Sequence, residues 1–135
     1  MPSERWTVGV APDLGLWLRA LKVDALSAPS SAKATMYRAL RRVFDQLLTD
    51  PVCAMAKNAA LKQPLGNVRR IKLGQGNRLR LFYLASPVKQ RVVVLFIGFR
   101  KSGDQSDAYA EFTTMLNKGA YDAVFAELEI EKPTG

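Results

Sequence analysis

The chain has 135 residues, of which 48% are hydrophobic, and a formal net charge of +8 at pH 7. This size and composition exclude a disordered chain and favour one domain over residues 1–135. A single cysteine excludes an intramolecular disulfide, and the absence of histidine removes the commonest metal ligand and acid–base group, so we expect no metal and no cofactor. No apolar run of membrane-spanning length and no signal peptide are evident, so we expect a cytoplasmic protein with no membrane partner.

The positive charge is concentrated in the middle of the chain. Residues 51–103 contain no aspartate or glutamate, but eleven lysines and arginines. A solvated basic surface would explain a scattered excess of positive charge, but not the exclusion of every acid from this interval. We therefore expect a polyanionic partner, and nucleic acid rather than a membrane, because no basic amphipathic helix is evident.

The first third of the chain predicts a strand followed by two helices. Residues 5–10 alternate like a short strand, and residues 12–26 begin with Pro-Asp and place apolar side chains at helical spacing. Residues 35–50 predict the second helix. Its apolar stripe consists of Met36, Leu40, Val43 and Leu47. Its arginines, which we interpret as a solvated face rather than a nucleic-acid contact, are Arg38, Arg41 and Arg42.

Three strands are predicted next. Residues 67–74 and 78–85 alternate between polar and apolar positions, as half-exposed strands do. Residues 91–99 are apolar on both faces, which is typical of a central strand. The connections at 74–77 and 86–90 are short enough for antiparallel hairpins.

A last helix is predicted over residues 106–119, with Ser106 as the N-cap and Gly119 just past the end. Residues 126–135 are acidic, and we expect them to fray. The element order is therefore β-α-α-β-β-β-α. It predicts an α+β fold with a mainly antiparallel sheet and helices packed on one face of the sheet.

Two arginines lie two residues apart in the second of the three strands. Because successive side chains of a strand point to opposite faces, Arg78 and Arg80 share a face with Phe82. The other face is lined by Leu79, Leu81 and Tyr83. An arginine pair in this position either extends into water or binds an anion. Phe82 either stacks on a nucleotide base or is covered by a helix, and we favour the helix.

The segment 69–116 resembles the RelE-type toxins of bacterial toxin–antitoxin systems. A basic strand, an arginine-rich hairpin strand, an apolar strand ending in arginine and a helix with an early tyrosine follow in the same order. The chain is most similar to the YhaV branch. The motifs that carry this similarity are R-I-K-L-G at 70–74, R-L-F-Y at 80–83 and D-A-Y-A-E-F-T-T-M-L-N-K-G at 107–119.

This resemblance implies a RelE/ParE-like fold and a metal-independent endoribonuclease that cuts mRNA, commonly on the ribosome. It also implies a cognate antitoxin, for which we expect an AbrB-like or small acidic protein, and binding of operator DNA through the antitoxin complex. Two alternatives remain: a ParE-like poison of DNA gyrase without ribonuclease activity, and a non-catalytic nucleic-acid-binding module. The retained set of basic residues argues against the gyrase poison.

Carried over residue by residue, the resemblance implies two groups of site residues. The catalytic group consists of Lys72, Arg80, Arg100 and Tyr109. The group that binds RNA or phosphate consists of Arg70, which the resemblance implies, and of Arg78 and Lys101, which are expected there because they lie beside Arg80 and Arg100 in the sequence. Arginine stays protonated and suits a phosphate clamp, whereas like-charged neighbours favour the neutral form of lysine, which can act as a base. Such a site is slow unless something else, such as the ribosome, aligns the RNA.

Several of these residues also suit a purely structural role. Arg70 and Lys72 would suit an exposed edge strand on which charge prevents aggregation. Tyr109 would suit an ordinary core stripe together with Phe112 and Leu116.

Overall fold

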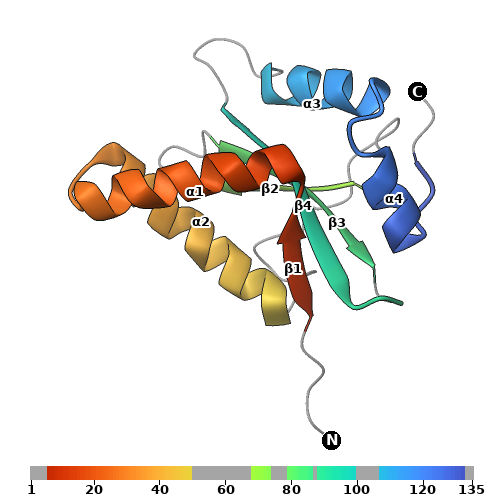
Figure 1. Cartoon of the computed structure of the whole chain (residues 1–135), viewed down its shortest axis with the longest axis horizontal. Helices are drawn as coiled ribbons and strands as arrows, with labels where there is room; N and C mark the ends of the chain where they lie inside the picture. The colour runs from red at the N-terminus through yellow and green to blue at the C-terminus, as the bar shows by residue number, and fades with distance from the viewer. Residues whose placement is uncertain (1–5, 50–67, 74–78, 87, 100–106, 133–135) are drawn as a thin grey trace, which may run out of the picture.

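The computed structural model describes residues 6–49, 68–73, 79–86, 88–99 and 107–132. The helices and strands of these ranges are drawn in Figure 1. In chain order they are β1 (Thr7–Val10), α1 (Pro12–Ser27), α2 (Ala32–Thr49), β2 (Arg69–Leu73), β3 (Leu79–Ser86), β4 (Arg91–Phe99), α3 (Asp107–Asn117) and α4 (Asp122–Leu128). Every expected strand and helix is present, and α4 is an additional helix.

The four strands form one mixed sheet in the order β1-β4-β3-β2. β2 pairs with β3 and β3 with β4 in antiparallel fashion, so both hairpin predictions are confirmed. β1 pairs with β4 in parallel, through Thr7–Val10 and Arg91–Val94. The apolar strand β4 lies between β1 and β3, as its two apolar faces predict.

One face of the sheet packs against α1 and α2. The predicted stripe of α2 is buried here, because Leu40, Val43 and Leu47 join one core cluster with Leu21 of α1. The sheet residues of this cluster include Ile71, Leu79, Leu81 and Tyr83. The prediction that Leu79, Leu81 and Tyr83 share one face of the strand is therefore confirmed.

The other face of the sheet packs against α3 and α4, so the expectation of helices on one face only is wrong. Phe112 of α3 and Phe125 of α4 belong to a second core cluster with Phe82, Leu84 and Leu95 of the sheet. Figure 1 shows the two helix pairs on different sides of β3 and β4. The physical reason is that β3, predicted to be half-exposed, is buried along nearly its whole length, and that β4 is apolar on both faces. Both faces of these strands therefore require a cover to exclude water.

Residues 126–132 of the acidic segment are packed, contrary to the expectation that they fray, and residues 133–135 lie outside the described ranges. Tyr121, Phe125 and Leu128 are buried at helical spacing. Two carboxylates pair with the basic β3–β4 hairpin: Glu127 with Arg91 at 3.0 Å and Glu129 with Lys89 at 3.6 Å. Apolar burial and opposite charge therefore hold the α4 segment against the sheet.

Gly119 makes the turn from α3 to α4 possible. Its φ is +84°, in the left-handed region, and a β-carbon there would lie 2.9 Å from Oδ2 of Asp122. The amide groups of Gly119 and Ala120 donate to the carbonyl oxygens of Leu116 and Met115, which closes the end of α3.

We predict that Gly119→Ala lowers the free energy of unfolding by about 1–3 kcal/mol, because alanine is strained at this φ and also contacts Asp122. Urea unfolding followed by circular dichroism measures the change. The control is Lys118→Ala at an exposed neighbouring position, which should change the free energy by less than about 0.5 kcal/mol. Equal stability of the Gly119 variant and the wild type would contradict the strain argument.

Candidate active site

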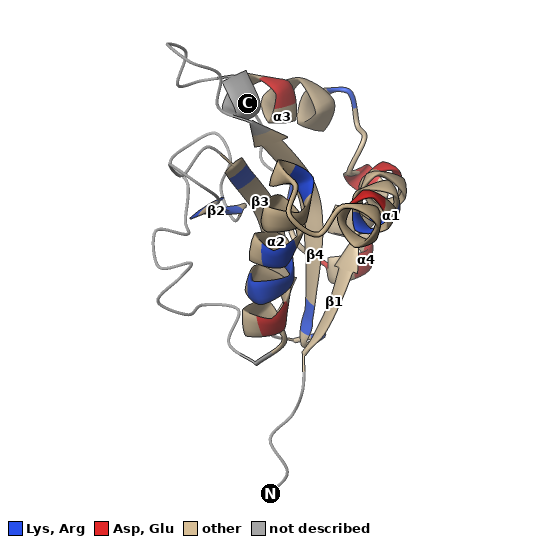
Figure 2. Cartoon of the chain, turned by 90° about the vertical axis from the view of Figure 1, so that its left-hand side faces the viewer, with Lys and Arg blue, Asp and Glu red and all other residues tan. Residues whose placement is uncertain are grey.

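The register of the sheet brings three of the predicted site residues together. Lys72 of β2 lies directly opposite Arg80 of β3, and Arg70 lies opposite Phe82. Because Arg70, Lys72 and Arg80 share one face, we call them the basic row. Directly opposite side chains on antiparallel strands have β-carbons only about 5 Å apart. In Figure 2 the blue segments of β2 and β3 lie next to one another, below α3.

Arg80 is the anchored member of the basic row. The residue is only 8% exposed, and its Nη1 atom donates a hydrogen bond to the carbonyl oxygen of Leu79 at 3.2 Å. A guanidinium cannot lose its charge at physiological pH, so this strand holds a fixed positive charge at a largely buried position. A charge held in this way is pre-organised to stabilise an anion.

The two residues on β2 differ in exposure. Lys72 is exposed, whereas Arg70 is half-buried. The Nε atom of Arg70 is buried and has no hydrogen-bond acceptor in the described part of the chain. A buried donor without an acceptor is costly, and an oxygen of a bound phosphate would satisfy it.

The position of each strand in the sheet separates two interpretations of these charges. β2 is an edge strand, so protection against aggregation remains an alternative for Arg70 and Lys72. β3 is an inner strand, and this alternative does not apply to Arg80. Like charges directly across a ladder repel one another, so the position of Lys72 opposite Arg80 carries an electrostatic cost.

Phe82 is covered by a helix, as favoured above. It is fully buried, and its ring stacks on that of Phe112 with centroids 4.5 Å apart and planes 1° from parallel. The face of the basic row is therefore closed at Phe82 by α3.

The other predicted site residues are not described at the level of side chains. Arg78, Arg100 and Lys101 lie outside the described residues. Tyr109 belongs to α3, but only its backbone is described. Phe112 and Leu116 of the same helix are buried.

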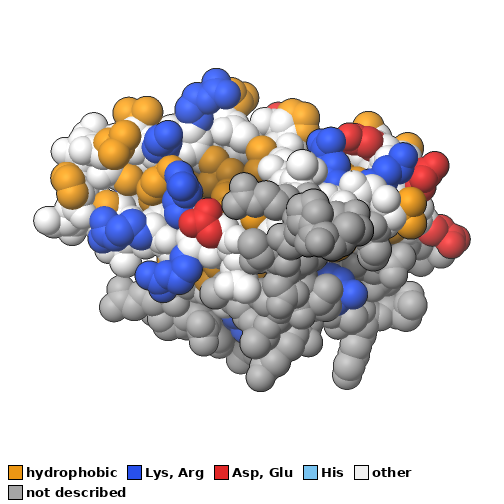
Figure 3. All heavy atoms as spheres, turned by 90° about the horizontal axis from the view of Figure 1, so that it is seen from below, with side chains coloured by type: hydrophobic (Ala, Val, Ile, Leu, Met, Phe, Trp, Pro, Cys, Tyr) orange, Lys and Arg blue, Asp and Glu red, His pale blue; other side chains and the backbone are white. Residues whose placement is uncertain are grey.

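The arginines of α2 do not belong to the basic row, because α2 covers the opposite face of the sheet. All three are exposed. Arg38 donates to the carbonyl oxygen of Pro29 at 3.1 Å, and the hydrogen bond from Arg41 to the Tyr37 hydroxyl raises the pKa of Arg41. Figure 3 shows lysine and arginine side chains gathered over α1 and α2, at the left of the view.

Sequence reasoning missed a cavity of about 570 Å³ beside β4. It lies among the start of α1, the second half of β4 and α3, and its polar side chains include Asp13, Glu111 and Tyr121. Burial and, to a lesser degree, the nearby Asp13 carboxylate raise the pKa of Tyr121 to about 12. The lining residues come from three distant parts of the chain, and no local pattern brings them together.

Two further kinds of feature, a metal centre and a membrane-spanning helix, are absent from the described ranges. No group of three or more histidine, cysteine, aspartate or glutamate residues is placed there to hold a metal ion. In the same ranges, no helix is both long and apolar enough to cross a membrane.

Comparison with known proteins decides the family. The model of the YhaV toxin family, described as a toxin with endonuclease activity, of toxin-antitoxin system, matches residues 20–132. The chain belongs to the YhaV toxin family. This YhaV-family chain is therefore a toxin with endonuclease activity, and its partner is the antitoxin of that system. The match includes β2, β3, β4 and both helices of the second face.

A solved structure supports the fold of this YhaV toxin. The toxin RelE of E. coli, as a double arginine-to-alanine mutant in the free state, superposes with a TM-score of 0.51 at 17% identity. The similarity covers 82% of this chain and 97% of the other. The predicted RelE-like α+β fold is thus confirmed. A search of curated proteins finds no match to this chain.

Proposed function

We propose that this YhaV-family toxin is a metal-independent endoribonuclease that cuts mRNA on the ribosome and does so with the basic row. The observation that carries the proposal is the register pairing of Lys72 with the largely buried Arg80. An anion bound between them would be contacted from two strands at once. The phosphate of a nucleic acid is the anion that an endonuclease must bind.

The reaction that suits these groups is attack by the ribose 2′-hydroxyl on the adjacent phosphorus. The bond from O2′ to phosphorus forms and the bond from phosphorus to O5′ breaks, which leaves a 2′,3′-cyclic phosphate and a 5′-hydroxyl. In its deprotonated form Lys72 accepts the proton of the 2′-hydroxyl, and in its protonated form it contributes to phosphate binding. Positive neighbours favour the deprotonated form of an amine. Arg80 stabilises the charge that develops on the phosphorane.

The remaining predicted site residues complete this mechanism. Tyr109 would donate the proton to the departing O5′ atom. Arg70, Arg78, Arg100 and Lys101 would hold the phosphates. Because DNA lacks the 2′-hydroxyl, it cannot react by this route, so the mechanism selects RNA.

The ribosome is the expected source of the missing catalytic power. The chain has no histidine, and general acid–base catalysis by less well-matched groups contributes only about 10²–10⁴-fold. Holding the 2′-hydroxyl in line with the scissile bond contributes further, and a ribosome that fixes the mRNA would supply this alignment. The toxin would then act in the cytoplasm.

The antitoxin would neutralise the toxin by supplying carboxylates to the basic row. Acidic side chains near Arg70, Lys72 and Arg80 would relieve repulsion and occupy the phosphate position. We propose an AbrB-like antitoxin whose complex with the toxin binds operator DNA.

We predict that the purified toxin cuts a labelled mRNA in the presence of ribosomes and leaves a 2′,3′-cyclic phosphate. The same message carrying a single 2′-deoxy nucleotide at the cleavage site should remain intact. Gel analysis and mass spectrometry of the fragments measure both results. Free RNA should be cut slowly, at the same rate with and without a chelator. Cleavage of the deoxy substrate, or a product with a 3′-hydroxyl, would contradict 2′-hydroxyl attack.

A further inference from the structure

The cavity beside β4 adjoins the basic row. Gly98 lines this cavity and is the register partner of Arg80 on the neighbouring strand. Adjacent strands lie about 4.8 Å apart, so the cavity begins one strand beyond Arg80. Gly98 has no side chain that would separate the two. β1 pairs only with Arg91–Val94, so no described strand pairs with the outer edge of β4 beyond Val94.

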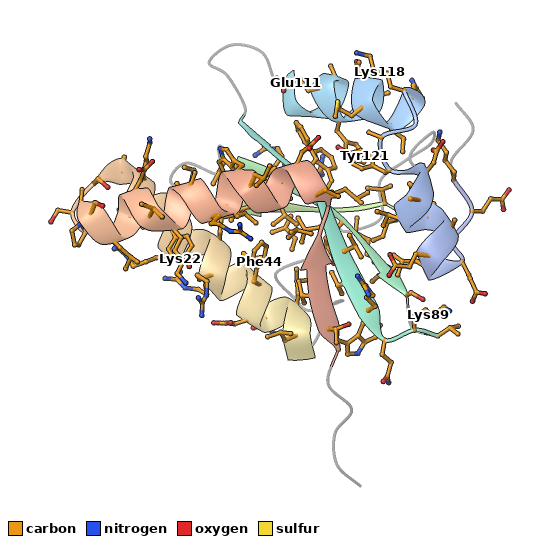
Figure 4. All side chains as sticks on the ribbon, viewed as in Figure 1. Lys22, Phe44, Lys89, Glu111, Lys118 and Tyr121 are labelled. Carbon is orange, nitrogen blue, oxygen red and sulfur yellow. The ribbon has the colours of Figure 1, made fainter. Side chains whose placement is uncertain are left out.

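The walls of the cavity combine flat apolar surfaces with polar groups. Trp17, Phe96 and Tyr121 supply the aromatic surfaces. Asp13 and Glu111, both exposed at the rim, supply carboxylates, which accept hydrogen bonds but donate none. Figure 4 shows Tyr121 between α3, which carries Glu111, and the start of α1.

The hydroxyl of Tyr121 is an unused donor in this cavity. Tyr121 is only 4% exposed, and its hydroxyl makes no hydrogen bond to another described residue. Asp13 and Tyr121 line the same cavity, and after burial the Asp13 carboxylate is the second cause that raises the pKa of this phenol. Its raised pKa, about 12, keeps the hydroxyl protonated at physiological pH, so it remains a donor.

We propose that this cavity binds a guanine base of the substrate RNA, next to the phosphate held by Lys72 and Arg80. The biological role of this base site rests on the proposed ribonuclease function, whereas the binding itself does not.

Guanine is the nucleobase whose edge fits these groups. Its N1–H and N2–H donate side by side to one carboxylate, and its O6 accepts from a hydroxyl such as that of Tyr121. Adenine, cytosine and uracil do not offer two adjacent donors beside an acceptor. The aromatic walls of Trp17 and Phe96 can stack on the base.

An arginine side chain of a protein partner is the competing occupant, because it too would pair with the carboxylates and lie on the aromatic rings. It carries donors only, so the hydrogen of the Tyr121 hydroxyl would still lack an acceptor. The position of the cavity one strand from the basic row also favours a part of the nucleic acid. These two observations favour the base.

The test measures binding of 3′-nucleoside monophosphates to the full-length chain by amide chemical shifts. The phosphate is the same in every probe, so differences report on the base. We expect GMP to bind at least ~10-fold more tightly than AMP, CMP or UMP, and also than IMP, which lacks the 2-amino group. The shifted amides should include those of Gly98, Glu111 and Tyr121.

Matched variants test whether the preference for GMP over the other nucleotides depends on the residues of the cavity. Asp13→Asn combined with Glu111→Gln should bring all five nucleotides within ~2-fold of one another, and Tyr121→Phe should reduce the GMP preference several-fold. Glu131→Gln, an exposed carboxylate outside the cavity, should leave the preference unchanged. Well-dispersed amide spectra of each variant confirm that it is folded.

Three results would overturn the proposal. One is equal binding of all nucleotides by the wild type, and another is a GMP preference that survives the double substitution. The third is stronger binding of agmatine than of GMP, abolished by the double substitution, which would assign the cavity to an arginine of a protein partner. Selective GMP binding in a chain that cuts no RNA would instead count against the ribonuclease function and leave the base site standing.

Discussion

Replacing Arg80 with alanine is expected to lower the rate of mRNA cleavage by at least ~100-fold, and to abolish growth inhibition when the toxin is expressed. Arg80 is a largely buried, permanently charged group directly opposite Lys72, so its loss removes a pre-organised source of charge stabilisation. Single-turnover cleavage on programmed ribosomes measures the effect, because it separates chemistry from product release.

Two further variants show whether the effect is specific. Arg80→Lys keeps the charge but loses the planar fork, and should recover only part of the activity. Arg19→Ala removes an exposed arginine from α1, which packs on the other face of the sheet. The cleavage rate of this variant should lie within ~3-fold of the wild-type rate. Thermal unfolding must show that Arg80→Ala is folded. A folded Arg80→Ala variant with wild-type cleavage would remove Arg80 from the mechanism.

The affinity of the toxin for RNA is expected to fall steeply with salt. Each phosphate neutralised by a lysine or arginine releases counterions. For a single-stranded nucleic acid, each such contact contributes about −0.7 to the slope of the logarithm of the binding constant against the logarithm of the salt concentration. Contacts by the three residues of the basic row alone predict a slope near −2, which is about a 20-fold loss of affinity between 50 and 200 mM salt. Fluorescence anisotropy with a short labelled RNA measures this slope.

The same measurement on variants locates the phosphate contacts. Arg70→Ala and Lys72→Ala should each make the slope less steep by about 0.7. Lys89→Gln, at the distant end of the β3–β4 hairpin where Lys89 pairs with Glu129, should leave it unchanged. A wild-type affinity that is flat over this salt range would show that the basic row is not a track for phosphates.

Much of this fold follows from local patterns in the sequence. The 3.6-residue spacing of Leu40, Val43 and Leu47 determines which side of α2 is buried, and the alternation of Leu79, Arg80 and Leu81 determines the two faces of β3. Gly119 marks the end of α3 for a similar reason, since few other residues adopt its backbone angle. The motifs around residues 70–83 and 107–119 were sufficient to indicate the YhaV family, which the family match confirms.

The candidate site was predicted only in part. The sequence motifs indicated Lys72 and Arg80 as site residues on consecutive strands of a hairpin. Only the register of the folded sheet shows that the two residues lie directly opposite one another. A shift of one residue would have turned Lys72 to the opposite face. The roles of Arg78, Arg100, Lys101 and Tyr109 stay predictions.

Other features were decided by the tertiary structure alone. The parallel pairing of β1 with β4, the cover that α3 and α4 provide for the second face, and the meeting of Asp13, Glu111 and Tyr121 at one cavity all join segments far apart in the chain. α4 illustrates the cause: its seven residues are too few for a stable isolated helix, and its order comes from burial of Phe125 and Leu128 against the sheet. Local patterns determine which side of an element is apolar, whereas the element that covers that side is determined by packing across the whole chain.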